Sequence, residues 1–238
     1  MSKIVRKINF GLWMYRFIFS MWPYYTRVNK FRTEGNIPAE IDAIRSLQHK
    51  WGCGVLEKFD IKLNISGLEN IPSEPVVFVS NHQSYADIPI FVAAIDRQIG
   101  FITKAELVKI PIFGQWIKAV RSVFIKRNDA RAAVRTIEAG VELLKQGFSL
   151  GVFPEGTRSR GPNMLKFKRG SLKIATKTGA PIVPVAISGS YKSFEQKGYP
   201  QATEVRFTVL PPIETKNLTK GEANNLTEKI EELIRRAL

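Results

Sequence analysis

The sequence predicts an α/β fold with a single, mostly parallel sheet flanked by helices, preceded by an N-terminal helical segment rich in aromatic and basic residues. Two observations predict the sheet. Helical patterns alternate with short runs of strand length, and these runs have hydrophobic cores, which is typical of strands in a parallel sheet. The strand candidates are residues 61–65, 76–79, 100–103, 120–126, 148–153, 182–187 and 205–210. With 238 residues and 44% hydrophobic side chains, the chain can bury a core without disulfides or a structural metal.

Proline and glycine indicate where the helices begin and end. Apolar residues at near-helical spacing predict a weakly amphipathic helix between residues 31 and 60, ended by Gly52 and Gly54. Pro89 suits a first helical turn, so the next helix is expected to begin near residues 87–89. Later helices are predicted at residues 129–146 and 168–178, each followed by a stopping glycine, and at residues 222–238.

The N-terminal segment combines aromatic side chains with positive charge. Residues 8–25 read INFGLWMYRFIFSMWPYY, and Arg16 interrupts an apolar run that falls short of the roughly 20 residues needed to cross a bilayer. Up to residue 35, seven Lys and Arg side chains stand against Glu34, a net charge of +6. We therefore expect residues 1–55 to dock on an anionic membrane surface and residues 56–238 to form the α/β domain. The alternative is a helix packed on the core with its aromatic side chains buried.

The chain as a whole is strongly basic. Its net charge of +15 and isoelectric point near 10.0 make a membrane surface or a nucleic acid the expected large partner. Cys53 is the single cysteine, which excludes an intramolecular disulfide. Two His and one Cys without clustered carboxylates do not provide the ligands of a structural zinc site.

Residues 81–87 (NHQSYAD) place His82 just after the apolar run 76–79 and Asp87 five residues later. A histidine at the end of a buried strand is held by rigid backbone and stays open to a substrate. Residues five apart lie on different faces of a helix, so the two side chains can meet only if His82 precedes the helix. We interpret them as a general base and the carboxylate that orients it. In the alternative interpretation, Ser84 and Asp87 form a capping box and His82 is a hydrogen-bonded turn residue.

A second polar loop, residues 154–160 (PEGTRSR), follows the strand candidate 148–153. Ligands of open α/β sheets bind at the carboxyl ends of parallel strands, so this loop and the His82 loop could line one site. Between residues 155 and 177 basic side chains outnumber acidic ones by seven to one. The basic residues are Arg158, Arg160, Lys166, Lys168, Arg169, Lys173 and Lys177. Arginine side chains and the backbone beside Gly156 suit a phosphate group, and a solvated surface loop is the alternative.

These segments resemble those of the 1-acylglycerol-3-phosphate acyltransferases, a family of glycerolipid acyltransferases. Residues 81–87 look like the family's NHx4D motif, and residues 153–159 match its FPEGTRS motif residue for residue. Further blocks similar to the family's follow in the expected order at residues 104–107, 111–114, 124–127 and 183–187. The resemblance runs from residue 75 to residue 188, about half of the chain. The chain departs from the family at Lys126, where an acid is common, and at Arg121, where glycine is frequent.

The resemblance implies transfer of a fatty acyl group from an acyl thioester to the free sn-2 hydroxyl of 1-acyl-glycerol-3-phosphate (lysophosphatidic acid), giving phosphatidic acid. His82 would be the general base and Asp87 would orient it, and no acyl-enzyme would form because the hydroxyl attacks the thioester directly. Substrate binding would fall to Lys104, Arg127, Glu155, Gly156, Thr157 and Arg158. Glu155 would either accept a hydrogen bond from a substrate hydroxyl or brace Arg158.

The resemblance also implies partners and a location. No cofactor or metal is expected, and the acyl donor would be a thioester of acyl carrier protein or coenzyme A. The expected location is the cytoplasmic face of the bacterial inner membrane, with monotopic attachment and no nucleic acid partner. Two alternatives are left. One is a related lipid enzyme, either a glycerol-3-phosphate acyltransferase or a phospholipid-remodelling transacylase, and the other is a non-enzymatic basic protein that binds nucleic acid or membranes.

Overall fold

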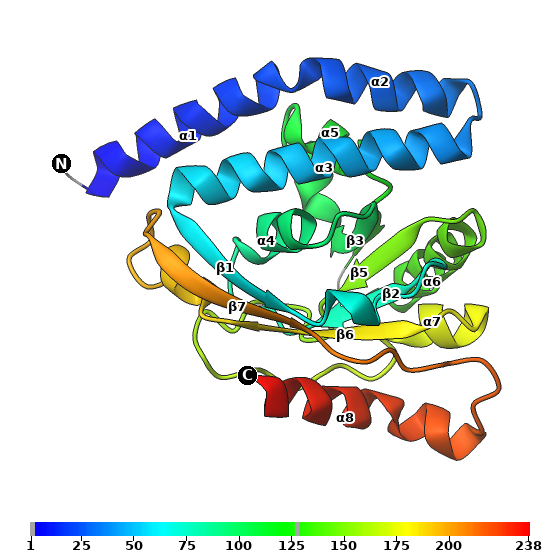
Figure 1. Ribbon diagram of the computed structural model, residues 1–238. Helices are drawn as coiled ribbons and strands as arrows, with labels where there is room; N and C mark the ends of the chain where they lie inside the picture. Colours follow the sequence, from blue (N-terminus) through cyan, green and yellow to red (C-terminus); the bar gives the residue numbers. More distant parts are fainter. Residues whose placement is uncertain (1–2, 127–128) are drawn as a thin grey trace.

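The computed structural model describes residues 3–126 and 129–238 and has a seven-stranded sheet at its centre (Figure 1). The strand order is β1-β7-β6-β2-β5-β3-β4, and neighbouring strands run parallel except for the antiparallel pair β6 and β7. The strands are β1 (Ile61–Ser66), β2 (Val77–Ser80), β3 (Ile99–Lys104), β4 (Val123–Ile125), β5 (Ser149–Val152), β6 (Ile182–Ser188) and β7 (Thr203–Val209). The predicted α/β fold with a mostly parallel sheet is confirmed.

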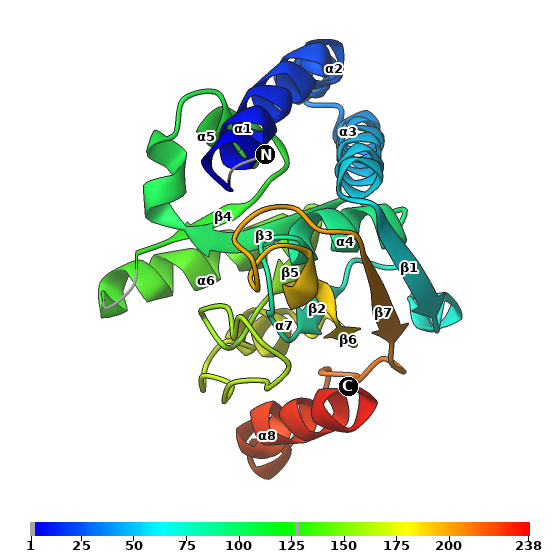
Figure 2. The ribbon, with the colours of Figure 1, turned by 90° about the vertical axis from the view of Figure 1, so that its left-hand side faces the viewer.

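Helices cover both faces of the sheet (Figure 2). They are α1 (Lys3–Ser20), α2 (Trp22–Thr33), α3 (Ile37–Phe59), α4 (Asp87–Ala94), α5 (Phe113–Ala119), α6 (Ala130–Lys145), α7 (Lys173–Thr178) and α8 (Lys220–Ala237), with 3-10 helices η1 (Leu68–Asn70), η2 (Ala105–Lys109) and η3 (Ser190–Ser193). On one face, α3 and α4 pack in a cluster that contains Phe78. On the other, α6, α7 and α8 pack in a cluster that contains Val77 and Val79. Alternating side chains of β2 therefore enter two separate core layers.

Two glycines of α3 serve close packing. The helix continues past Gly52 and Gly54, so the helix end predicted there is wrong. A Cβ at Gly52 would lie 2.8 Å from the Pro89 carbonyl oxygen on α4, and a Cβ at Gly54 would collide with the Phe17 ring on α1. These glycines therefore let α4 and α1 approach α3. The helix ends instead at Asp60, whose backbone is left-handed with a φ of 52°.

The other helix boundaries follow the sequence with one exception. The Asp129 side chain accepts a hydrogen bond from the Ala132 amide and caps α6 at the predicted start. Gly179, with a φ of 72°, closes α7 as predicted. The predicted start of that helix at residue 168 is wrong, because Gly170 has a φ of 89° and the segment before Lys173 forms turns.

The first two helices form an arm that runs antiparallel to α3 (Figure 1). One face of α1 packs against the core through Phe10, Trp13, Met14 and Phe17. The exposed large hydrophobic side chains of the arm lie three or four residues apart, at Val5, Ile8, Leu12, Tyr15, Phe19 and Trp22. The aromatic side chains of the arm are thus divided between the core and the surface. Within the described ranges, no helix is long and apolar enough to cross a membrane.

A buried ion cluster joins this arm to the sheet. Glu40 on α3 is 1% exposed and accepts hydrogen bonds of 2.7–2.8 Å from Arg32 on α2 and from Arg121, which precedes β4. Arg121 has a φ of 59°, the left-handed region that favours glycine, and its guanidinium lies 4.9 Å from the centre of the Phe148 ring. Where the family that the sequence resembles often has glycine, this chain has Arg121, which keeps a backbone conformation typical of glycine and pairs with Glu40. Burial raises the pKa of Glu40, but the bonds from Arg121 and Arg32 outweigh it and hold the pKa below the usual value.

Replacing Glu40 by Gln should lower the free energy of unfolding at pH 7 by about 2–4 kcal/mol, because two arginines lose their shared carboxylate. The pKa of Glu40 is below its ordinary 4.5, so the stabilisation is complete above that pH and is lost as the pH falls through the folded-state pKa. Urea unfolding of wild type and Glu40→Gln at neutral pH and at steps below pH 4.5 measures the difference. The difference should shrink in acid, and an equal difference at every pH would contradict an ionic contribution.

Candidate active site

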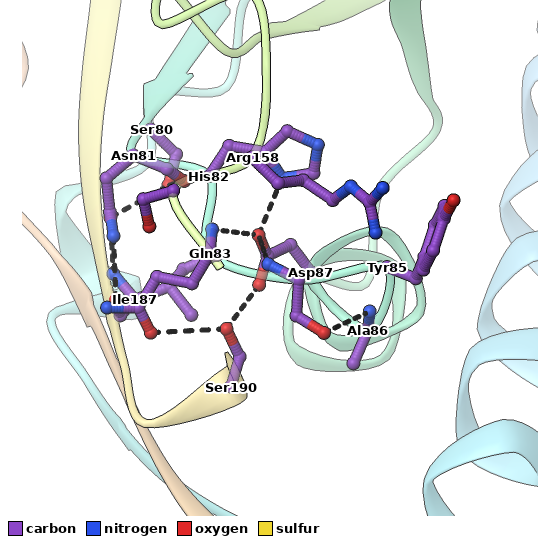
Figure 3. A network of polar contacts seen from close by, with 12 residues as sticks. Ser80, Asn81, His82, Gln83, Tyr85, Ala86, Asp87, Arg158, Ile187 and Ser190 are labelled. Atoms are coloured by element: carbon purple, nitrogen blue, oxygen red, sulfur yellow. Dashed lines mark hydrogen bonds and ion pairs between the residues drawn. The ribbon is translucent and has the colours of Figure 1, made fainter. Parts of the chain in front are cut away.

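His82 and Asp87 meet in the turn between β2 and α4. His82 Nδ1 lies 2.7 Å from Asp87 Oδ2, and the Asp87 side chain is fully buried while that of His82 is 19% exposed (Figure 3). The predicted meeting of these two side chains is confirmed, since His82 precedes the helix that Asp87 begins. In the described part of the chain, no protein group bonds Nε2 of His82, so this nitrogen can face a substrate.

Asp87 also fixes the turn itself. Its Oδ2 atom accepts hydrogen bonds from the amides of Gln83 and Ser84, at 2.7 Å and 2.9 Å, and its Oδ1 atom accepts one of 2.5 Å from the Ser190 hydroxyl. The Ser84 hydroxyl accepts from the Ala86 amide, at 3.2 Å, which is the role of a turn residue. The expected capping box is not complete, because the N-cap of α4 is Ala86 and the Ser84 hydroxyl does not accept from the Asp87 amide. The Asp87 carboxylate itself both holds the turn and contacts His82 (Figure 3).

The residues around His82 in the NHx4D segment attach this turn to β6. Asn81 is buried, donates through Nδ2 to the Ile187 carbonyl at 2.8 Å, and accepts from the Ile187 amide at 2.9 Å. Gln83 accepts from the Gly189 amide at 3.0 Å. Three hydrogen bonds thus fix the position of the turn relative to a neighbouring strand.

An aromatic ring holds the plane of the imidazole. Phe153, which follows β5, stacks on His82 with ring centres 4.2 Å apart and an angle of 21° between the planes. Phe101 on β3 stacks in turn with Phe153, with ring centres 5.9 Å apart and an angle of 7° between the planes. The first residue of FPEGTRS therefore helps to position the ring that the NHx4D segment supplies.

Glu155 links the two loops through backbone groups. Its Oε1 atom accepts a 2.6 Å hydrogen bond from the His82 amide and its Oε2 atom a 2.9 Å bond from the Leu165 amide, while the His82 carbonyl accepts 2.8 Å from the Ser159 amide. The carboxylate is 2% exposed, and this burial raises its pKa above the usual value. Glu155 does not brace Arg158, because Arg158 pairs with Glu195 instead.

Arg158 is held between an aromatic ring and an acid. Its Nη1 atom donates to Glu195 Oε1 at 2.6 Å, and its Cζ atom lies 3.4 Å from the centre of the Tyr85 ring. Glu195 also accepts from the Tyr85 amide at 3.3 Å. Since the arginine side chain is 16% exposed, its remaining N–H groups can still reach a ligand.

The other expected substrate-binding residues are placed in part. Gly156, with a φ of 67°, and the exposed Thr157 occupy the turn after β5. Lys104 is the last residue of β3. Strand β5 lies between β3 and β2 and runs parallel to both, so all three strands end at the same edge of the sheet. Lys104 is half-exposed and forms an ion pair with Glu106 at 3.4 Å. Arg127 lies outside the described residues.

Ser190 and Glu195 lie on one segment after β6 and were not predicted as site residues. Ser190 contacts Asp87, whereas Glu195 contacts Arg158, so the segment supports both loops. A sequence signal existed for Ser190, because it follows a third apolar strand at the same edge of the sheet. No pattern in the sequence indicated Glu195. Among the described residues, no group of three or more His, Cys, Asp and Glu could hold a metal ion.

Replacing Ser190 by Ala should lower kcat about three- to tenfold with little change in KM, because Asp87 loses a charge-assisted hydrogen bond. Steady-state kinetics measure both constants. Ser193→Ala is the matched control, since Ser193 lies in the same 3-10 helix and its hydroxyl donates to the Ser190 carbonyl, at 2.6 Å, not to Asp87. Equal effects of the two substitutions would show that the segment matters only for folding.

Comparison with known proteins agrees with this geometry. The model of the Acyltransferase family matches residues 62–188. The chain belongs to the acyltransferase family. A 1-acyl-sn-glycerol-3-phosphate acyltransferase of Borreliella burgdorferi is 32% identical over 73% of this acyltransferase and 70% of its own length. The crystal structure of the 1-acyl-sn-glycerophosphate (LPA) acyltransferase PlsC from Thermotoga maritima superposes with a TM-score of 0.82 at 30% identity, over 98% of this chain and 93% of that one.

Plant relatives are longer than this acyltransferase. The chloroplast 1-acyl-sn-glycerol-3-phosphate acyltransferase of Arabidopsis thaliana is 42% identical over 55% of this chain, which covers 37% of that protein. The chain thus spans less than half of the length of this relative. The family suggested by the NHx4D and FPEGTRS segments is confirmed, and both segments lie inside the matched region.

Proposed function

We propose that the protein transfers a fatty acyl group from an acyl thioester to the sn-2 hydroxyl of 1-acyl-glycerol-3-phosphate, giving phosphatidic acid for phospholipid biosynthesis. The observation that carries this proposal is the His82–Asp87 pair, 2.7 Å apart, joined by Glu155 to a loop with an arginine. Relatives named 1-acyl-sn-glycerol-3-phosphate acyltransferase support the choice of acceptor.

In the proposed mechanism, His82 Nε2 takes the proton of the sn-2 hydroxyl as the hydroxyl oxygen attacks the thioester carbonyl carbon. The tetrahedral intermediate then expels the thiolate, which receives the proton from His82, so the base is regenerated. Asp87 accepts the Nδ1 hydrogen, which fixes the tautomer and stabilises the imidazolium. No acyl-enzyme forms, because the acceptor is the nucleophile and the buried Ser84 hydroxyl is occupied in its turn.

Phosphate binding is proposed for the basic residues at the carboxyl edge of the sheet. Arg158 has N–H groups beyond the one that bonds Glu195, and Gly156 and Thr157 form an exposed turn beside it. Lys104 and Arg127 would contribute further positive charge, whereas Glu155 supports the loop from beneath. Holding the phosphate places the free hydroxyl near His82, and such positioning can lower a barrier by several kcal/mol.

The arm formed by α1 and α2 is proposed as the membrane attachment. Its exposed stripe from Val5 to Trp22 and its basic residues fit an interface with anionic lipid. Attachment would be monotopic, on the cytoplasmic face of the bacterial inner membrane, with residues 1–55 as the docking segment and residues 56–238 as the catalytic domain. The donor would be a thioester of acyl carrier protein or coenzyme A, with no cofactor and no nucleic acid partner.

The experiment that tests this proposal is a matrix of acceptors against donors. Liposome-bound protein is assayed with lysophosphatidic acid, glycerol 3-phosphate and lysophospholipids, each with acyl carrier protein and coenzyme A thioesters, and His82→Ala is the inactive control. Turnover of lysophosphatidic acid above all other acceptors is expected. Turnover of another alcohol without lysophosphatidic acid would reject the proposal in favour of a related lipid enzyme, and the absence of any turnover would favour a binding protein.

A further inference from the structure

A lysine outside the FPEGTRS segment lies against its glycine. A Cβ built on Gly156 would lie 2.8 Å from Nζ of Lys168, 3.1 Å from its Cε and 3.4 Å from its Cδ. The Lys168 side chain therefore passes directly over the bare Cα of the turn that is proposed to receive a phosphate. Gly156 has a φ of 67°, a backbone conformation that favours glycine, and a side chain at this position would collide with Lys168.

The position of Lys168 is fixed by backbone bonds. The Lys168 amide donates to the Pro154 carbonyl at 3.0 Å, and three residues earlier the Leu165 amide donates to Glu155 at 2.9 Å. Phe167 is buried, and its amide donates to Glu231 on α8 at 2.9 Å. The backbone on which the lysine stands is therefore attached to the FPEGTRS loop on one side and to α8 on the other.

Three cations around the site have acidic partners that Lys168 lacks within the described ranges. Arg158 pairs with Glu195 at 2.6 Å, Lys104 with Glu106 at 3.4 Å, and the adjacent Arg169 with Glu228 at 3.3 Å. For Lys168, the described ranges contain no carboxylate within ion-pair distance. The Lys168 ammonium, held over the turn without a counter-ion, therefore offers its charge to an anion on that turn.

We propose that Lys168 Nζ binds the phosphate group of a substrate on the Gly156–Thr157 turn, beside Arg158. This inference rests on the proposed function and assigns to that site a cation outside both sequence motifs. The phosphate belongs either to the acceptor, 1-acyl-glycerol-3-phosphate, or to the phosphopantetheine arm of the donor. The Lys168 ammonium would contribute a point charge with rotatable donors, and the Arg158 guanidinium, two residues from Gly156 in sequence, would contribute a planar set of N–H donors.

The test compares Lys168→Ala, Lys168→Arg and the control Arg169→Ala. The control removes the same charge one residue away, from a side chain that is 88% exposed and paired with α8. Lys168→Ala should raise KM about tenfold with kcat changed less than twofold, as for the loss of one charged hydrogen bond, and Lys168→Arg should recover most of the affinity. A raised KM for lysophosphatidic acid alone assigns the acceptor phosphate, and a raised KM for the donor alone assigns the donor phosphate.

A binding measurement separates failure of this inference from failure of the proposed function. Calorimetric titration with glycerol 3-phosphate and, separately, with coenzyme A needs no turnover. Lys168→Ala should weaken the dissociation constant of one of them about tenfold, while Arg169→Ala leaves both within twofold. Unchanged binding and unchanged KM in Lys168→Ala, equal losses in Arg169→Ala, or a loss confined to kcat would each overturn the inference.

Discussion

Replacing His82 by Ala should reduce kcat/KM for acyl transfer by about 10³-fold, within the 10²–10⁴ range that a general base contributes. An alcohol is a poor nucleophile until its proton leaves. Glu155 cannot take over as the base, because it is buried and bonded to two amides. The His82 side chain contacts Asp87 and Phe153 near the surface, so the fold should survive its removal. Initial rates with lysophosphatidic acid and an acyl thioester measure the loss.

A second variant separates chemistry from structure in this prediction. His82→Asn keeps an N–H donor that can reach Asp87 but provides no basic nitrogen towards the substrate. It should be as inactive as His82→Ala, while binding to anionic liposomes, measured by flotation, stays at the wild-type level for both. More than about a tenth of wild-type activity in His82→Asn would contradict general-base catalysis by this residue.

The sheet could be predicted because its central strands are mostly apolar. Strands buried between two helical layers carry few polar residues, and each of the apolar runs contains a strand. Strand β4 is shorter than the predicted run 120–126, because Arg121 adopts a left-handed backbone to reach Glu40 and cannot extend the strand. That ion pair joins residues 81 positions apart, which no local pattern encodes.

In the site, too, contacts between residues close in sequence could be predicted, and contacts between distant segments could not. His82 and Asp87 meet within one turn, so spacing and Pro89 were enough to predict the contact. Ser190 and Glu195 approach the turn only because β6 pairs with β2, a choice made by the whole sheet. The glycines of α3 were misinterpreted for a related reason: a glycine that ends a helix and a glycine that admits a neighbouring helix look alike in sequence.

Asp87→Asn should lower kcat roughly 10²–10⁴-fold while costing little stability, because the substitution removes charge and preserves the local hydrogen bonds. An Asn oxygen at the Oδ2 position can still accept from the Gln83 and Ser84 amides. Its amide group at the Oδ1 position can donate to the Ser190 hydroxyl, which can turn its own hydrogen to Gln83 Oε1 at 3.3 Å. Kinetics and thermal unfolding of the same preparation measure the two effects.

This variant decides between the two roles that one carboxylate fills. If Asp87 only caps the turn, Asp87→Asn keeps the cap and kcat stays near the wild-type value. If it also stabilises the imidazolium, kcat falls, and adding Asp87→Asn to His82→Asn causes no further loss because no imidazolium forms in that background. Two outcomes would contradict the orienting role. One is that Asp87→Asn lowers kcat by the same factor in the His82→Asn background as in the wild type, and the other is that the fall in kcat is accompanied by a large loss of stability. The proposed mechanism therefore predicts that the charge of this buried carboxylate is needed in addition to the turn that it holds.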